Sequence, residues 1–295
     1  MMNKISCFGE VLWDEFPNER IIGGAPLNVA VRLKSLGNDV SMMSRIGIDI
    51  DGKKILDFIK NNNIDVSGVQ VDEILSTGTV KVVLNAKGSA SYTIAFPRAW
   101  DNIQWDETSK KIVDSSDAFV FGSLVTRNHP SKETLFNLLK IAKYKIFDVN
   151  LRTPYYTTEI LTFLMNQADF IKFNDEEIYE ISNLLGSNAI SLEQNIKFIA
   201  DKTNTNTICV TKGKHGAVLY TNKTFYHNSG YQIKVMDTVG AGDSFLAGLI
   251  HMLLKKIPPQ QSINYACALG AIVASRAGAN PIISDQEIQQ IMFGQ

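Results

Sequence analysis

The stretch Asp237-Thr-Val-Gly-Ala-Gly-Asp243 leads directly into an apolar segment at residues 245–254. Small residues that run into an apolar-periodic segment indicate a loop that becomes a helix. The first amides of a helix lack intrahelical partners and carry a partial positive charge, and glycine lets a ligand approach the backbone closely. These features predict an anion-binding nest made by the amides of Gly240, Ala241 and Gly242.

Asp243 follows this nest directly. A carboxylate beside an anion site is electrostatically unfavourable unless it has a role, such as accepting the proton of the group that attacks the anion. An aspartate in the first turn is also typical of a simple helix cap. The local pattern leaves both interpretations open.

The composition is that of an ordinary soluble globular protein. Of 295 residues, 45% are hydrophobic and 20% charged, and the formal net charge of -1 predicts neither a nucleic-acid nor a membrane-binding surface. Three distant cysteines without a C-x-x-C spacing predict reduced, buried thiols: Cys7, Cys209 and Cys267. Neither a signal peptide nor a membrane span is recognisable, so we expect a cytoplasmic protein.

Strand patterns alternate with helical stripes along most of the chain. Strands are expected at residues 4–8, 40–47, 118–122, 145–149, 170–173, 207–211 and 216–220. This alternation predicts an α/β fold with a mostly parallel central sheet and helices on both faces. Since no repeat or low-complexity linker interrupts it, we expect a single domain over residues 1–295.

Two β-rich runs at 79–84 and 91–96 break this rhythm and are joined by a hairpin signal at 86–90. They predict a small sheet beside the main one, built from about residues 12–22 and 77–100. Its apolar faces suit a lid over a site and also a dimer surface, and we expect a homodimer formed through it.

Several polar residues are expected where strands end, which is where open α/β sheets bind their ligands. Asp14 is a candidate hydroxyl-binding carboxylate, or else a solvated loop acid. A Gly23-Gly24 pair precedes Asn28 at a helix start, where Asn28 is either a cap or a ligand contact. Asp49 is expected to be an acid at the start of the helix predicted at 53–61.

Three further groups of residues are candidates for ligand contacts. Asp148, Asn150 and Arg152 alternate at the end of a strand, so they are expected to share one face and to contact a polar ligand. The spacing of Asn174 and Glu177 is that of a capping box, although a glutamate near a phosphate site also suits magnesium held through water. The turn 211–216 is compatible with nucleotide phosphates.

Other nucleotide and metal motifs do not fit. The turn 211–216 departs from the G-x-x-x-x-G-K-[ST] pattern, and the glycines at 240 and 242 lack the third glycine of a dinucleotide fingerprint. The four histidines have no metal-ligand spacing.

Taken together, these motifs resemble the ribokinase-like (phosphofructokinase B) carbohydrate kinases, most closely the fructokinase branch. The resemblance covers nearly the whole chain. It is carried by residues 23–30, 44–47, 51–52, 174–177, 211–213, 237–245 and 277–279, while 9–14 and 148–152 are similar to the fructokinase branch.

The resemblance implies transfer of the γ-phosphoryl group of ATP to a primary hydroxyl of a free sugar, with Asp243 as base and the amides of Gly240, Ala241 and Gly242 as anion hole. The implied sugar-binding residues are Asp14, Gly24, Asn28, Arg98 and Arg152. The implied nucleotide-binding residues are Asn174, Thr211, Gly213, Gly216, Asn264 and Ala268. Magnesium is implied at Glu177 through water, and potassium near Asp237, Val239 and Gly278.

Fructose is the expected sugar, so the chain is expected to be a fructokinase whose small-molecule partners are sugar and ATP. Alternative substrates are 2-keto-3-deoxygluconate, ribose, a nucleoside or a sugar phosphate; Arg98 and Arg152 are the basic groups that a sugar phosphate needs. A non-catalytic sugar sensor and a nicotinamide oxidoreductase are alternatives from other classes. The intact Gly-Ala-Gly-Asp argues against the sensor, and the missing fingerprint argues against the oxidoreductase.

Overall fold

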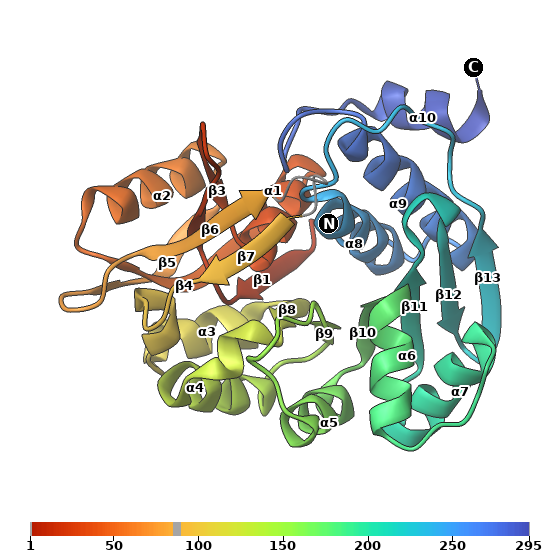
Figure 1. Ribbon diagram of the computed structural model, residues 1–295, viewed down its shortest axis with the longest axis horizontal. Helices are drawn as coiled ribbons and strands as arrows, with labels where there is room; N and C mark the ends of the chain where they lie inside the picture. Colours follow the sequence, from red (N-terminus) through yellow and green to blue (C-terminus); the bar gives the residue numbers. More distant parts are fainter. Residues whose placement is uncertain (1, 85–89, 295) are drawn as a thin grey trace. The chain divides into compact units, whose positions relative to one another are not determined.

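The computed structural model describes residues 2–84 and 90–294, and Figure 1 traces its helices and strands. The chain groups into two compact units. Unit 1 comprises Met1–Phe119 and Val125–Lys143, and unit 2 comprises Val120–Leu124 and Tyr144–Gln295. Across the described residues, no helix has the length and apolarity needed to cross a membrane.

Nine strands form one hydrogen-bonded sheet in the order β13-β12-β11-β10-β9-β8-β1-β4-β5. Its pairs are parallel from β1 to β4 to β5 and from β9 to β10 to β11. β12 runs antiparallel to both of its neighbours, β11 and β13. The expected α/β fold with a mostly parallel central sheet is confirmed.

Unit 1 contains a layer of parallel strands with helices around it. Its strands are β1 (Lys4–Phe8), β4 (Asp39–Gly47) and β5 (Asp65–Asp72), together with the start of β8 (Ala118–Gly122). The rings of Phe8 and Phe119 meet in its core at 6.1 Å between centroids. The helices are α1 (Ala25–Ser35), α2 (Ile50–Asn61), α3 (Glu107–Ser115) and α4 (His129–Leu139), with a 3-10 turn, η1, at Ala99–Asn102.

A separate four-stranded sheet in unit 1 has the order β3-β2-β6-β7 (Figure 1). β2 (Leu12–Glu15) pairs antiparallel with β3 (Arg20–Gly23) and parallel with β6 (Gly78–Leu84), which pairs antiparallel with β7 (Ala90–Ile94). The expected small sheet is confirmed, and it takes two strands from the early segment. The hairpin turn expected at 86–90 falls, up to residue 89, outside the described residues.

Unit 2 continues the strand–helix alternation. Its helices α8 and α9 run side by side (Figure 1), and a Cβ placed at Gly248 of α8 would lie 2.9 Å from the Leu269 side chain of α9. The strands are β9 (Lys145–Asp148), β10 (Phe170–Asn174), β11 (Thr207–Thr211), β12 (Ala217–Thr221) and β13 (Thr224–Asn228). The helices are α5 (Thr158–Gln167), α6 (Asp175–Leu184), α7 (Leu192–Thr203), α8 (Ala241–Leu254), α9 (Pro259–Ala274) and α10 (Asp285–Phe293).

Three elements had no clear sequence signal. β5 mixes exposed, half-buried and buried positions without strict alternation, α3 has few apolar residues, and β13 is an edge strand with no buried position. The helix α2 begins at Ile50, earlier than predicted, because the side chain of Asp49 caps it by accepting the Gly52 amide at 2.7 Å. The interpretation of Asp49 as a helix-start acid is confirmed.

Candidate active site

The α8 turn, defined here as residues 237–243, has a backbone that favours glycine. Gly240 is the N-cap of α8 with φ 72°, in the left-handed region, and a Cβ placed there would lie 2.5 Å from the Cβ of Ala279. The turn therefore needs both the conformational freedom and the small volume of glycine. The predicted loop-to-helix transition is confirmed, with Asp243 half-buried in the first helical turn.

Hydrogen bonds within the turn decide which amides remain for an anion. The Ala241 amide donates to the Thr238 carbonyl at 3.2 Å, and the Ser244 amide donates to the Gly240 carbonyl at 2.8 Å. One of the three amides predicted for the nest therefore already has a backbone acceptor. Gly242 is exposed, and its position at the positive end of α8 still suits a negatively charged group.

Asp237 is hydrogen-bonded to the two other residues that were predicted to bind a monovalent cation, Val239 and Gly278. Its Oδ1 accepts the Val239 amide at 2.9 Å, and its Oδ2 accepts the Gly278 amide at 3.0 Å. The structure thus brings these residues together. Each carboxylate oxygen still has a lone pair after accepting one amide, so this group remains compatible with a cation that prefers oxygen ligands.

Glu177 is buried at the start of α6. Its Oε2 accepts the Asn174 amide at 2.8 Å and its Oε1 accepts the Leu151 amide at 2.9 Å, while Asn174 Oδ1 accepts the Glu177 amide. The capping-box interpretation is therefore confirmed. Burial raises the pKa of Glu177 above its ordinary value, against the lowering effect of Lys172 and of the two amides.

A buried ion pair lies between two neighbouring strands of unit 2. Lys172 Nζ on β10 donates to Asp148 Oδ1 at the end of β9, at 2.9 Å. Although burial would lower the pKa of Lys172, the carboxylates of Asp148, Glu177 and Asp243 raise it. We call Asp148, Lys172 and Glu177 the β10 cluster.

Lys172 is a residue of this site that was not predicted from the sequence. Its signal was a single lysine inside the apolar run 170–173, in a strand that the sheet buries on both faces. The second carboxylate oxygen of Asp148, Oδ2, is buried and has no hydrogen-bond partner among the described residues. A buried polar atom of this kind is compatible with a metal ion or a polar ligand at this cluster.

The expectation for 148–152 was wrong in one respect. β9 ends at Asp148, and Asn150 has φ 39°, so the alternation of a strand does not continue and the three side chains do not share one face. Asp148 is buried, whereas Arg152 is exposed and its guanidinium donates to the neighbouring Leu151 carbonyl at 2.8 Å.

The nucleotide candidates of unit 2 gather around the loop after β11. The Lys212 amide donates to the Gly216 carbonyl at 2.7 Å, and the Gly216 amide donates to the Gly213 carbonyl at 3.2 Å. These two hydrogen bonds close the loop that follows Thr211. Gly216 has φ 76°, and a Cβ there would collide with the Asn228 carbonyl.

α9 contributes the other two nucleotide candidates. Asn264 Oδ1 accepts hydrogen bonds from Asn228 at 2.9 Å and from Gln260 at 3.0 Å, while Ala268 is fully buried. Asn228 therefore links the loop after β11 to α9. Its place at the end of a polar edge strand gave no sequence signal.

In unit 1, Asp14 and the two glycines come together. Asp14 lies on β2, and a Cβ placed at Gly23 would collide with its Oδ2. Gly24 is the N-cap of α1 with φ 111°, and a Cβ there would collide with the Glu10 carbonyl. Asn28 lies inside α1, is 6% exposed, and is not the cap.

Arg98 is held near a network of polar groups. Asp49 accepts hydrogen bonds from the Thr77 amide at 2.8 Å and the Thr77 hydroxyl at 2.6 Å. Burial would raise the pKa of Asp49, but these bonds, the Gly52 amide and the charge of Arg98 lower it. Arg98 Nε is buried without an acceptor among the described residues. We call Asp14, Gly24, Asn28 and Arg98 the N-terminal polar group.

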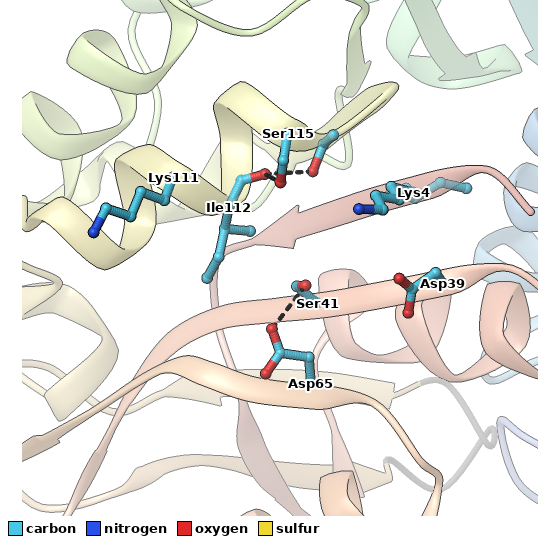
Figure 2. Close-up of a pocket in the computed structure, with 9 residues that line it drawn as sticks. Lys4, Asp39, Ser41, Asp65, Lys111, Ile112 and Ser115 are labelled. Carbon is cyan, nitrogen blue, oxygen red and sulfur yellow. Dashed lines mark hydrogen bonds between the residues drawn. The ribbon is translucent and has the colours of Figure 1, made fainter.

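A groove of about 260 Å³ elsewhere in unit 1 is not part of this group (Figure 2). It is lined by Lys4, Asp39 and Asp65, the first residues of β1, β4 and β5, and by the end of α3. Within its lining, Ser41 of β4 donates to Asp65 of the neighbouring strand β5 at 3.0 Å. The lining of the groove includes none of the residues of the N-terminal polar group.

The remaining predicted features are structural. Cys7, Cys209 and Cys267 are free and buried, as expected. A buried ion pair joins Arg127 to Asp101 at 2.6 Å, and the Arg127 guanidinium lies 4.0 Å from the centre of the Trp100 ring. These contacts hold the segment that follows β7. Sequence reasoning did not single out Arg127, because nothing near it marked it as buried.

Known proteins are similar to this chain in sequence and in fold. A probable fructokinase of Arabidopsis thaliana is 28% identical over 97% of this chain and 91% of its own length. A putative sugar kinase of Pyrococcus horikoshii is 30% identical over 80% of this chain and 74% of its own length. The structure of a Vibrio cholerae O395 fructokinase matches with TM-score 0.84 at 23% identity, covering 99% and 98% of the two chains. A putative ribokinase of E. coli matches with TM-score 0.88 at 19% identity over both chains entirely, so the fold is ribokinase-like. Residues 3–286 match the model of the pfkB family carbohydrate kinases, and the chain therefore belongs to that family.

Proposed function

We propose that this sugar kinase transfers the γ-phosphoryl group of ATP to a primary hydroxyl of free fructose. The observation that carries the proposal is the α8 turn: a left-handed Gly240, an exposed Gly242 and a half-buried Asp243 at a helix N-terminus. That arrangement combines a site for an anion with a carboxylate beside it.

Fructose is supported by the relatives. The protein of Arabidopsis thaliana and several other plant relatives carry the name fructokinase. The Vibrio cholerae fructokinase has been solved with fructose, ADP and potassium, and also with fructose, ADP and calcium, and a Xylella fastidiosa fructokinase has been solved with ATP. We extend these ligands to this chain as a proposal.

In this mechanism Asp243 accepts the proton of the attacking hydroxyl. The positive end of α8 stabilises the charge on the transferred phosphoryl group, which is what phosphoryl transfer chiefly requires. The N-terminal polar group and Arg152 bind the sugar. Asn174, the loop 211–216 and α9 at Asn264 and Ala268 bind the nucleotide.

Two ions complete the proposed site. Glu177 would hold magnesium through water, together with Asp148 Oδ2, for which the described part of the chain supplies no hydrogen-bond partner. Oxygen atoms near Asp237, Val239 and Gly278 would hold potassium. Magnesium would neutralise phosphate charge during transfer. The chain's own residues orient the two substrates and move the proton.

We further propose that the small sheet acts as a lid that excludes water, and that two copies pair through it in the cytoplasm. Its β2–β3 hairpin is anchored within unit 1. Arg20 makes two hydrogen bonds to Asp51 of α2, at 3.1 and 2.7 Å, and its guanidinium lies 4.9 Å from the centre of the Trp13 ring. Sedimentation of the purified chain tests the homodimer, and a monomer at working concentrations would contradict it.

One observation favours an acidic acceptor as a second candidate. Arg98 Nε is buried and lacks an acceptor among the described residues, and a carboxylate or phosphate of the acceptor would supply one. A sugar acid such as 2-keto-3-deoxygluconate, or a sugar phosphate, is therefore the alternative substrate.

The test is a coupled assay of ADP release with ATP, magnesium and potassium over free sugars, sugar acids, nucleosides and sugar phosphates. We expect the highest kcat/KM on fructose. Preference for a sugar acid or phosphate would keep the reaction but replace the acceptor. Sugar binding without turnover on any compound would instead identify a non-catalytic sensor.

A further inference from the structure

Lys172 is a buried cation to which the proposed roles give no task. It lies in the middle of β10 and is 6% exposed. Its ammonium donates to Asp148 at 2.9 Å, and the described residues supply no second hydrogen bond to it. Since an ammonium has three N–H donors, the pairing with Asp148 does not exhaust what Lys172 can bind.

The ammonium lies behind the first turn of α8. A Cβ placed at Gly242 would be 3.8 Å from Lys172 Nζ, which is ordinary van der Waals contact, so the ammonium lies close to the backbone of this turn. The carboxylate of Asp243, the next residue, attracts the same ammonium. The Lys172 ammonium is therefore close both to Asp148 and to the α8 turn.

Stability alone does not account for a lysine at this place. Removing two charges from water offsets most of their attraction, so replacing a buried ion pair by apolar residues is often neutral or stabilising. A positive charge fixed near a transferring phosphoryl group stabilises the transition state, because negative charge is spread over the phosphoryl oxygens during the reaction.

We propose that Lys172 is a positioning residue for phosphoryl transfer, with Asp148 as the group that orients it. Its ammonium holds the Gly242–Asp243 turn from the β10 side by attraction to the Asp243 carboxylate. It also adds positive charge to the N-terminus of α8, where the phosphoryl group is bound. This inference rests on the proposed kinase function and adds two residues to it.

The experiment compares Lys172→Met, which removes the charge, with Lys172→Arg, which keeps it. For Lys172→Met we expect kcat to fall by ~10²-fold, the size of losing one preorganised group that stabilises transition-state charge, while KM for the sugar changes little. Lys172→Arg should recover a large part of kcat. The matched control is Lys145→Met, on the neighbouring strand β9, which should retain wild-type kcat.

A double variant separates catalysis from packing. Asp148→Asn with Lys172→Met removes both buried charges, so it should fold even if the lone Asp148 carboxylate destabilises the single variant. Because Asp148 is also proposed to lie beside magnesium, the reference for the double variant is Asp148→Asn alone. A purely structural ion pair predicts that the double variant has the same kcat as this reference. Our proposal predicts that its kcat is lower than that of the reference although the melting temperature recovers.

The outcomes distinguish the two proposals. If the wild-type chain releases no ADP with any compound of the panel, the proposed function fails and the inference falls with it. If the wild type is active and either Lys172→Met matches its kcat or the double variant matches the kcat of Asp148→Asn, the kinase proposal stands and the role of Lys172 is overturned. A kcat below the respective reference in both, with rescue by arginine, supports the positioning role.

Discussion

The α8 turn in unit 2 and the N-terminal polar group in unit 1 differ in how deeply their charged side chains are buried. Beside the α8 turn, Lys172 and Asp148 are fixed by burial, at 6% and 4% exposure. In the N-terminal polar group, Asp14 and Arg98 are half-buried. On the proposed function, the turn serves a phosphoryl group that is the same in every such kinase, whereas the polar group serves a sugar that varies.

This difference predicts that the two regions have separate functions, one in turnover and the other in sugar binding. Changes in the α8 turn should lower turnover on every sugar, because they affect the phosphoryl group and the proton. Changes in the N-terminal polar group should mainly alter which sugar binds and how tightly. The following variants test that separation, beginning with the largest expected effect.

Asp243→Asn should lower kcat by ~10²–10⁴-fold, the range typical of losing a general base, because the amide cannot accept the hydroxyl proton. Steady-state ADP release on the preferred sugar measures it. The matched control is Asp285→Asn, another acid in the first turn of a helix, α10, which should leave kcat unchanged. Near-wild-type turnover in Asp243→Asn would remove the base assignment.

Gly240→Ala should destabilise the fold by about 2 to 4 kcal/mol, since the left-handed backbone and the contact with Ala279 both oppose a Cβ. Denaturant unfolding measures the change. Gly186→Ala is the matched control: Gly186 also has a positive φ, at 91°, but no described residue has an atom within 4 Å of the added Cβ. Equal losses in the two variants would show that the Ala279 contact contributes nothing.

Asp14→Ala should weaken sugar binding by about 10- to 100-fold, as expected for losing a hydrogen bond to a charged group, with a much smaller effect on nucleotide affinity. Calorimetry with the sugar and with ATP separates the two. The control is Glu15→Ala, the next residue of β2, whose side chain pairs with Arg20 at 3.1 Å. Unchanged sugar affinity in Asp14→Ala would take this residue out of the site.

The sequence predicted the elements whose pattern is local. The glycines at 240 and 242 with an apolar helix behind them, and the capping spacing of Asn174 and Glu177, each specify a short stretch of backbone, and the structure contains both. What the sequence did not predict depends on residues that are distant along the chain. Lys172 meets Asp148 only because β9 and β10 pair in parallel.

The same reasoning explains the error at 148–152. Extending the strand alternation to Arg152 assumed that β9 continues, and only the left-handed backbone of Asn150 shows that it does not. In the N-terminal polar group, Asn28 was correctly placed near a helix start. Its burial inside α1 could not be read from the residues around it.

His251 tests whether the far end of α8 is independent of the turn at its start. Burial lowers the pKa of His251 to about 4, with Lys255 lowering it further and Asp285 opposing. Above the ordinary pKa of 6.5 the histidine is neutral in both states, so it adds no pH dependence. As the pH falls from 6.5 towards 4, only the unfolded state takes up the proton, and the free energy of unfolding therefore decreases.

We expect His251 to reduce the free energy of unfolding by about 2 kcal/mol at pH 5 relative to pH 7. Denaturant unfolding of the wild type and of His251→Gln at both pH values isolates the contribution of His251 to the free energy of unfolding, because glutamine does not take up a proton in this pH range. His129→Gln, which changes an exposed histidine of α4, should keep the wild-type pH dependence. If His251→Gln keeps it as well, the acid sensitivity arises from other groups. If it flattens the pH dependence while leaving kcat at pH 7 unchanged, the stability of α8 and the chemistry of its first turn are separable properties of one helix.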